Sequence, residues 1–237
     1  MAGVTVIIPC LNEAATIGSV VSDVLMQGVD AVIVVDNGST DGTADVARRA
    51  GAQIIAQPTR GYGNACAAGV AAVTAPRAIL CFMDGDGSDV PELLPELVLP
   101  VRAGTADFVM GSRLRGRREP GSLTPQQIFA ARLAGVLLRL TYGVRFTDMS
   151  PLRAIRADCL ASLGMREATY GWNLEMQMRA AAAGLRGLAI PADHRLRRGG
   201  QSKVSGNLVA GLSATWKIST TFLRLAIGLR RTTTALR

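Results

Sequence analysis

Aromatic residues make up only 4% of this 237-residue chain, and His194 is its single histidine. So few aromatic side chains offer little surface for stacking bases, and no zinc-finger spacing occurs, which argues against a nucleic-acid-binding protein. With no second histidine beside it, we expect His194 to be structural and not a zinc ligand. The cysteines form no CxxC pair, so we expect reduced core thiols at Cys10, Cys66, Cys81 and Cys159.

Long uncharged segments are also missing from the sequence. No run of about 18 or more residues lacks charge, so we expect no transmembrane helix. Neither GxGxxG nor GxxxxGK[ST] follows the first apolar stretch, which argues against a Rossmann dehydrogenase and a P-loop enzyme. We expect a cytoplasmic protein that lies peripherally at the cytoplasmic face of a membrane.

The composition is that of a globular protein with a positive bias. Hydrophobic residues make up 49% and charged residues 19% of the chain, which suits one large α/β domain. The formal net charge is +8. Such a charge favours nucleic acid, an anionic membrane surface or a phosphate-bearing substrate as partner, and by itself does not rank them. An oligomeric state cannot be inferred.

Apolar stretches of strand length alternate with stretches of helical character. We expect strands at 4–8, 31–35, 53–56 and 78–83, and helices at 44–50, 64–73, 126–142 and 171–183. We also expect Pro9 to end the first strand, and Thr40 or Asp41 to cap helix 44–50. This alternation predicts a mainly parallel central sheet, flanked by helices and joined by right-handed crossovers.

An acidic loop follows the apolar strand 78–83. Asp84 and Asp86 stand two positions apart, separated by a glycine that lets both carboxylates turn toward one point. Mg²⁺ and Mn²⁺ prefer such oxygen ligands and bridge to substrate phosphates. The alternative is a solvated Asp/Gly turn. A calcium loop of the EF-hand type does not fit, because Asp89 and Pro95 stand where glycine and glutamate are needed.

A second polar loop, residues 36–43, follows the strand at 31–35. Asp36 ends this strand and is followed by glycine and hydroxyl residues at a helix start. A carboxylate in this position can accept hydrogen bonds from a base or a ribose. The alternative is an ordinary Asx-turn that caps the next helix.

Several motifs in order resemble the family-2 glycosyltransferases of the GT-A fold, and most closely the dolichol-phosphate mannosyltransferase-like branch. They are residues 8–13, 35–42, 83–92, 110–113, 147–156, 170–177 and 197–205. The resemblance covers about residues 4 to 206. It implies a UDP- or GDP-sugar donor, Mg²⁺ or Mn²⁺, and inversion at the anomeric carbon.

The resemblance also implies roles for individual residues. Nucleotide-sugar binding is expected at Pro9, Asn12, Glu13, Asp36, Gly38, Ser39, Asp84, Asp86, Arg198, Ser202 and Lys203. Asp86 is expected to be the principal metal ligand, with Asp84 and Ser88 beside it. A catalytic role is expected for Asp86, Arg113, Asp148 and Glu175, and acceptor binding for Arg113, Arg132 and Arg153. Ser150 and Leu152 depart from the family pattern, in which Gly and Phe are common, and they alter the expected sugar pocket.

The nature of the acceptor decides whether a general base is needed. A polyprenyl phosphate is already anionic and needs cationic side chains, whereas a hydroxyl on a saccharide or small molecule needs a carboxylate base. The resemblance favours the lipid phosphate. Glu175 is the candidate base for a hydroxyl acceptor, and its alternative role is a surface ion pair with Arg179 at i+4.

Two segments have the pattern of amphipathic helices. In helix 126–142 we expect one apolar face, and Arg132 and Arg139 on a common side; the face comprises Phe129, Leu133, Val136, Leu137 and Leu140. This is either an ordinary docked helix or an interfacial one that contacts an anionic membrane. We expect a glycosyltransferase domain at 1–205, and an amphipathic helical tail at 206–237 that binds a membrane or a partner.

Overall fold

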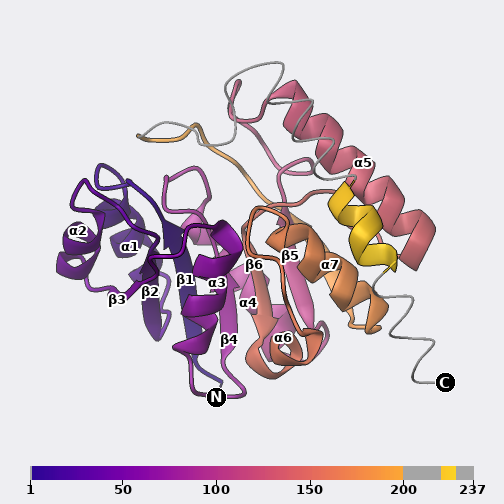
Figure 1. The fold of residues 1–237 in the computed structure, drawn as a ribbon, viewed down its shortest axis with the longest axis horizontal. Helices are drawn as coiled ribbons and strands as arrows, with labels where there is room; N and C mark the ends of the chain where they lie inside the picture. The colour runs from indigo at the N-terminus through magenta and orange to yellow at the C-terminus, as the bar shows by residue number, and fades with distance from the viewer. Residues whose placement is uncertain (1, 200–219, 228–237) are drawn as a thin grey trace.

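The computed structural model describes residues 2–199 and 220–227, and it contains a seven-stranded sheet (Figure 1). The strands are β1 (Val4–Cys10), β2 (Ala31–Asp36), β3 (Gln53–Ala56), β4 (Ile79–Phe82), β5 (Phe108–Ser112), β6 (Arg153–Arg156) and β7 (Gly187–Pro191). Their order is β3-β2-β1-β4-β6-β5-β7. β6 runs antiparallel to β4 and β5, and the other pairings are parallel. The predicted mainly parallel sheet is confirmed.

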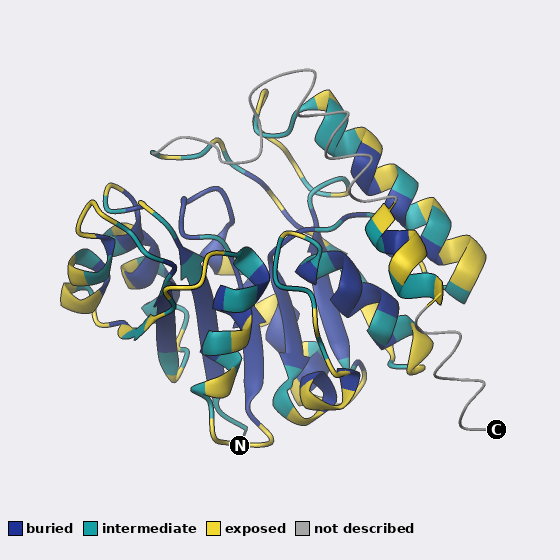
Figure 2. Ribbon diagram, in the orientation of Figure 1, coloured by how far each residue is buried: buried dark blue, intermediate teal, exposed yellow. Residues whose placement is uncertain are grey.

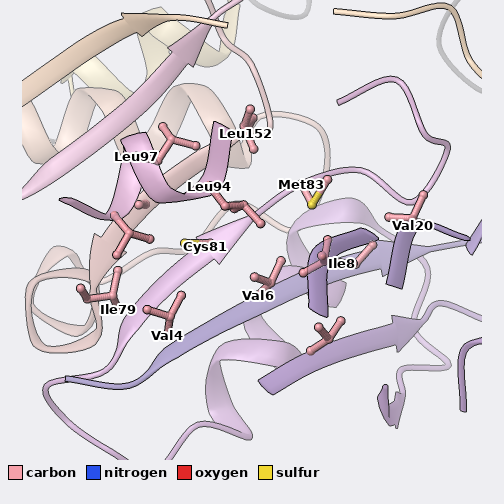
Figure 3. Close-up of a cluster of buried hydrophobic side chains, with 14 of the residues drawn as sticks. Val4, Val6, Ile8, Val20, Ile79, Cys81, Met83, Leu94, Leu97 and Leu152 are labelled. Carbon is pink, nitrogen blue, oxygen red and sulfur yellow. The ribbon is translucent and has the colours of Figure 1, made fainter. Parts of the chain in front are cut away.

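Helices cover both faces of this sheet (Figure 1). They are α1 (Ile17–Leu25), α2 (Thr43–Arg49), α3 (Tyr62–Ala71), α4 (Leu94–Arg102), α5 (Pro125–Tyr142), α6 (Ala157–Leu163) and α7 (Trp172–Ala182), with a 3₁₀ turn at Pro91–Leu93. Successive β1 side chains enter different cores: Val6 and Ile8 pack with Leu94 of α4 (Figure 3), whereas Ile7 packs with Cys66 of α3. This double burial explains why the strands are continuously apolar.

The first strand does not end at Pro9, as predicted, but continues to Cys10. Pro9 pairs in register with Val35 of β2. The Cys10 carbonyl accepts the Asn37 N–H on the β2 side, so the neighbouring Pro9 nitrogen faces the β4 side. The pairing of β1 with β4 extends only to Ile7. Pro9 is tolerated because no ladder hydrogen bond is required at its nitrogen.

The start of α2 also differs from the prediction. Gly42 is its N-cap, with φ of 87°, and not Thr40 or Asp41. The Asp41 carboxylate nevertheless accepts the Thr43 N–H at 3.0 Å and the Ala14 N–H at 3.0 Å. Asp41 therefore ties the start of α2 to the loop that follows β1.

The face that α5 packs against the domain is not the apolar face predicted from the sequence. The helix buries its small residues together with one leucine: Ala130, Ala131, Ala134 and Leu138. Phe129, Val136 and Leu140 are instead 59%, 54% and 79% exposed. Figure 2 shows exposed residues along the length of α5. A Cβ on Gly135 would lie 2.6 Å from the Phe146 carbonyl oxygen, so only a face of small side chains allows this close approach.

A helical segment at residues 220–227 lies beside α5 and α7 (Figure 1). Phe222 is buried in the cluster that contains Leu138 of α5 and Met178 of α7. Leu223 and Ile227 remain exposed. The expected boundary after residue 205 lies outside the described residues. Among the described helices, none has the length and apolar character needed to cross a bilayer.

Asp107 ties the start of β5 to the start of β7 through Arg186. Its carboxylate accepts hydrogen bonds from Arg186 Nε at 2.9 Å, Nη2 at 2.7 Å and the backbone N–H at 3.0 Å. The Arg186 side-chain hydrogen bond lowers the pKa of Asp107 from 3.8 to about 2, against the effect of partial burial. Because the folded value lies below the unfolded one, this stabilisation is complete above about pH 4 and is lost as the pH falls toward 2.

Asp107→Asn is therefore expected to lower the free energy of unfolding at neutral pH by about 1 kcal/mol, since the Arg186 side chain is 58% exposed and solvent screens the pair. The deficit should shrink as the pH falls from 3.8 through about 2, the pKa of Asp107 in the folded protein, and vanish below it. Urea denaturation across this pH range measures it. Asp45→Asn, which breaks the more exposed Asp45–Arg48 pair, is the matched control and should cost less. A deficit that is equal at both ends of the pH range would contradict the prediction.

Candidate functional site

A cleft of about 680 Å³ lies at the carboxyl ends of β1 and β4. Open α/β sheets bind their ligands at this edge. One wall comes from the loops after β1, β3 and β4, and the other from the start of α5 and from residues 169–173. The lining includes Pro9, Glu13, Asn37, Arg60, Tyr62, Asp84, Asp86, Ser88, Thr124, Gln127, Thr169, Tyr170, Asn173, His194 and Arg197.

The acidic loop after β4 is held in a fixed conformation by its own side chains. Asp86 Oδ1 accepts the Ser88 N–H at 2.9 Å and the Ser88 hydroxyl at 2.6 Å. The Asp84 N–H donates to Asp89 Oδ2 at 3.0 Å. A Cβ on Gly85 would lie 2.5 Å from Cys10 Sγ, so glycine is required between the two aspartates. The predicted metal ligands Asp84, Asp86 and Ser88 are thus brought together in the cleft.

Negative charge accumulates in this loop. Burial and the neighbouring carboxylates of Asp89 and Asp86 raise the pKa of Asp84 well above its ordinary value. Burial also raises the pKa of Asp89 to about 7, although its carboxylate accepts the Asp84 N–H. A divalent cation would relieve this repulsion, and the donors present are oxygens, which hard cations prefer.

The described residues contain no group of three or more His, Cys, Asp or Glu side chains arranged to hold a metal ion. Mg²⁺ and Mn²⁺ do not require one, because they keep water ligands and bind through one or two carboxylates and substrate phosphates. The oxygen donors of Asp84, Asp86 and Ser88 fit such an ion.

Arg197 is a cleft residue that the sequence analysis missed. Its Nη2 lies 3.0 Å from Asp86 Oδ2 and 3.0 Å from Glu13 Oε1. The predicted residue, Arg198, instead lies 3.4 Å from Asp23 Oδ2. The two arginines are adjacent in one motif, and only the path of the chain decides which one enters the cleft. Ser202 and Lys203 lie outside the described residues.

The residues predicted to bind the nucleoside fall into two groups. Pro9 and Glu13 line the cleft, whereas Asn12, Asp36, Gly38 and Ser39 are not among its lining residues. Among these four, Asn12 and Ser39 join the loop after β1 to the loop after β2. The Asn12 N–H donates to Ser39 Oγ at 2.9 Å, and the Ser39 N–H donates to Asp36 Oδ1 at 2.8 Å. Asp36 thus orders its own loop, but it does not cap the next helix as the alternative expected, because Gly42 is the N-cap of α2.

Asn37 and Arg60 reach the cleft beside this pair of loops, and the sequence analysis assigned neither. The Asn37 amide donates to the carbonyls of Gln57 and Thr59 and accepts the Gly61 N–H at 2.8 Å. Arg60 Nη2 donates to the Gly38 carbonyl at 3.0 Å. The available signal in the sequence was an asparagine directly after Asp36. Its side-chain amide can both donate and accept, so it can bind several backbone groups.

Arg113 and Asp148, both predicted to be catalytic, form a buried ion pair. The guanidinium donates from Nε to Oδ2 and from Nη2 to Oδ1, each at 2.8 Å. Burial alone would raise the pKa of Asp148, but the Arg113 charge holds it below its usual value. Neither residue is among those lining the cleft. Arg113 nevertheless acts on the acidic loop, because its positive charge lowers the pKa of both Asp84 and Asp89 and so opposes the effect of burial.

Glu175 is not positioned as a general base, and this prediction is corrected. Its side chain is fully buried and forms an ion pair with Arg179 at 2.8 Å. Oε2 accepts the backbone N–H groups of Arg166 and Glu167 at 3.0 and 2.7 Å. The alternative pairing with Arg179 is confirmed, although in the interior and not on the surface. Glu175 holds the 165–170 segment, which leads to the cleft residues Thr169 and Tyr170.

Arg153, predicted to bind the acceptor, is also corrected, since its side chain is 0% exposed. The guanidinium donates to backbone carbonyls of Ser150, Pro151 and Asn173 and lies 5.9 Å from the Phe108 ring centroid. Arg153 therefore joins backbone segments that form the cleft wall, and its charge does not face the cleft. The third predicted acceptor residue, Arg132, is exposed on α5 and is not among the lining residues.

The wall opposite the acidic loop combines aromatic and small polar side chains. The rings of Tyr62 and Tyr170 stack with centroids 6.3 Å apart and an angle of 22° between their planes. At the start of α5, the Thr124 hydroxyl accepts the Gln127 N–H in a capping box. Thr124 and Gln127 both line the cleft, so the first turn of α5 forms part of its wall.

Comparison with known proteins shows which family and which relatives this chain resembles. A family model described as glycosyl transferase family 2 matches residues 5–164. An uncharacterized glycosyltransferase of Mycobacterium tuberculosis is 40% identical over 227 residues, covering 92% of this chain and 99% of its own. An undecaprenyl-phosphate mannosyltransferase of Micrococcus luteus is 34% identical over 222 residues, covering 84% of this chain and 87% of its own.

Solved structures share the fold. Glucosyl-3-phosphoglycerate synthase from Mycobacterium tuberculosis, in complex with Mn²⁺, UDP and glucosyl-3-phosphoglycerate, superposes with a TM-score of 0.73 at 25% identity. The match covers 95% of this chain and 80% of that one. The same architecture therefore extends over nearly the whole chain.

Proposed function

Because the chain belongs to glycosyl transferase family 2, and is a glycosyltransferase that uses a nucleotide-sugar, we propose that it transfers the sugar, with inversion, to a polyprenyl phosphate. Its fold is the GT-A fold that the motifs predicted. The UDP- or GDP-sugar is proposed to lie along the acidic loop, with its diphosphate near Asp84 and Asp86. A relative that shares this fold was solved with Mn²⁺ and UDP, which supports a metal ion and a nucleotide as ligands.

A bound Mg²⁺ or Mn²⁺ would supply positive charge to the diphosphate as the glycosidic bond breaks. Asp86, with Asp84 and Ser88, would hold this ion. Arg197 lies at the same place and can donate to phosphate oxygens, which arginine contacts in bidentate geometry. The positive charge of Arg113, which Asp148 holds in place, limits the charge repulsion within the loop.

The choice of acceptor rests on where the carboxylates lie and which groups they bind. Glu175, the candidate base for a hydroxyl acceptor, and Asp148, the other carboxylate predicted to be catalytic outside the acidic loop, are buried and engaged by arginine and backbone N–H groups. The acidic residues that line the described cleft are Glu13, Asp84 and Asp86, all on the side of the acidic loop. An acceptor whose oxygen is already anionic needs no base.

The surface of α5 supports an acceptor that is presented by a membrane. The exposed face of the helix combines Phe129, Val136 and Leu140 with Arg132 and Arg139, and the helix carries no acidic residue. Such a face fits an anionic lipid surface. We propose peripheral contact there, with the lipid phosphate entering at the first turn of α5.

One experiment tests this function. The enzyme is incubated with labelled UDP- and GDP-sugars and Mn²⁺, and with undecaprenyl phosphate either in anionic vesicles or in detergent. Organic extraction should recover labelled lipid, with faster transfer in the vesicles. Parallel reactions offer phosphoglycerate or a disaccharide instead. Transfer only to these hydroxyl acceptors would overturn the lipid assignment, and equal rates in vesicles and detergent would count against the membrane contact.

A further inference from the structure

The Arg197 guanidinium lies at the place where an ion held by Asp86 would bind. Its Nη2 is 3.0 Å from both Asp86 Oδ2 and Glu13 Oε1. The side chains of Asp86 and Glu13 are only 13% and 6% exposed, so the contact lies largely out of solvent. The second oxygen of Asp86 is already engaged by Ser88. Oδ2 is therefore the oxygen through which Asp86 would bind a cation, and Arg197 contacts it.

The backbone that carries Arg197 is anchored to the acidic loop. We call residues 194–198 the strap. Within it, the Arg195 N–H donates to the Ser88 carbonyl at 2.9 Å and the Arg198 N–H donates to the Asp86 carbonyl at 3.0 Å. A Cβ on Gly87 would lie 2.9 Å from Arg198 Cδ, so the strap crosses closely over this glycine. The long Arg197 side chain can change rotamer while the strap stays in place.

A divalent ion on Asp86 and the guanidinium in its present position would be like charges sharing one carboxylate oxygen. Their repulsion in a partly buried site is stronger than it would be in water. One of the two must move. Arg197 is the partner that can move. Its backbone stays anchored, and a rotation of its side chain would carry the guanidinium along the cleft that Arg197 already lines.

We propose that Arg197 is an internal counter-ion of the metal site, which the arriving metal ion displaces onto the diphosphate of the donor. This rests on the proposed function. In the donor-free enzyme, Arg197 neutralises Asp86 and Glu13 and weakens binding of the metal alone. When a nucleoside diphosphate is present, its oxygens accept the displaced guanidinium. Metal and nucleotide therefore bind cooperatively, each raising the affinity for the other by the same factor.

Mn²⁺ binding to the full-length protein tests this, measured by electron paramagnetic resonance with and without UDP or GDP. For Arg197→Ala and Arg197→Gln, we expect Mn²⁺ alone to bind about 10-fold more tightly than to the wild type, within the roughly 5- to 150-fold range of typical couplings. The improvement in Mn²⁺ affinity on adding nucleotide should shrink by a similar factor. Two replacements of different size guard against a folding defect in one.

Arg195→Ala is the matched control. It removes the same charge from the strap, but Arg195 pairs with Glu92 outside the acidic loop, so affinity for Mn²⁺ alone should stay at the wild-type value. Equal Mn²⁺ affinity in the wild type and both Arg197 variants would overturn the counter-ion role, even in an active enzyme. No Mn²⁺ binding by any protein, with or without nucleotide, would overturn both this role and the proposed metal dependence.

Discussion

Asp86→Ala is expected to lower kcat by roughly 100- to 1000-fold, the usual cost of losing one preorganised charge contact to the transition state. Asp86 is the carboxylate that we propose as the principal ligand of the metal ion. Its Oδ2 faces Arg197 at 3.0 Å, and its Oδ1 fixes the loop through Ser88. Without the carboxylate, the departing diphosphate would lose the anchor of its metal ion.

Steady-state transfer assays at saturating donor measure this loss. Asp86→Asn keeps the shape and one carbonyl oxygen, so it separates the loss of charge from the loss of loop structure. Asp45→Ala, on the exposed face of α2, is the matched control and should keep wild-type kcat. Thermal melting of each variant checks folding. Wild-type turnover in both Asp86 variants would refute the metal-anchoring role of this residue.

Glu175→Ala is expected to lower the free energy of unfolding by about 3 to 5 kcal/mol, because it removes the fully buried half of an ion pair and leaves a largely buried arginine without its partner. Arg179 lies 2.8 Å from Oε1, and its side chain is 18% exposed. The N–H groups of Arg166 and Glu167 also lose their acceptor. Glu175→Gln keeps one acceptor oxygen, so a smaller loss of about 1 to 3 kcal/mol is expected.

The kinetics of Glu175→Gln distinguish a structural role of Glu175 in the cleft wall from a role as general base. With a lipid-phosphate acceptor, kcat per folded molecule should fall less than about 10-fold, since general-base catalysis contributes roughly 100- to 10,000-fold where it operates. Denaturant titration and transfer assays are run on the same preparations. Arg179→Gln breaks the same ion pair from the other side and should lower stability similarly. A selective collapse of kcat in Glu175→Gln with unchanged stability would restore the general-base role.

Agreement between sequence and structure is closest where chemistry is local. Asp84, Asp86 and Ser88 lie within five consecutive residues, and the turn that brings them together depends on Gly85 and Gly87. Prediction failed where distant segments meet. Glu175 and Arg153 were expected in the cleft, yet their charged groups satisfy backbone groups behind its wall. A sequence shows that a charge is present, but not on which side of the wall it lies.

The sequence alone determined the α/β class, the parallel half of the sheet and the acidic loop at the end of β4. Apolar periodicity and glycine chemistry act over a few residues, so these features can be inferred without knowing what packs against them. Tertiary structure decided the antiparallel course of β6, the buried face of α5 and the entry of Arg197 into the cleft. Each depends on contacts between segments far apart in the chain, such as Gly135 with Phe146 and Arg197 with Glu13, which only the folded molecule brings together.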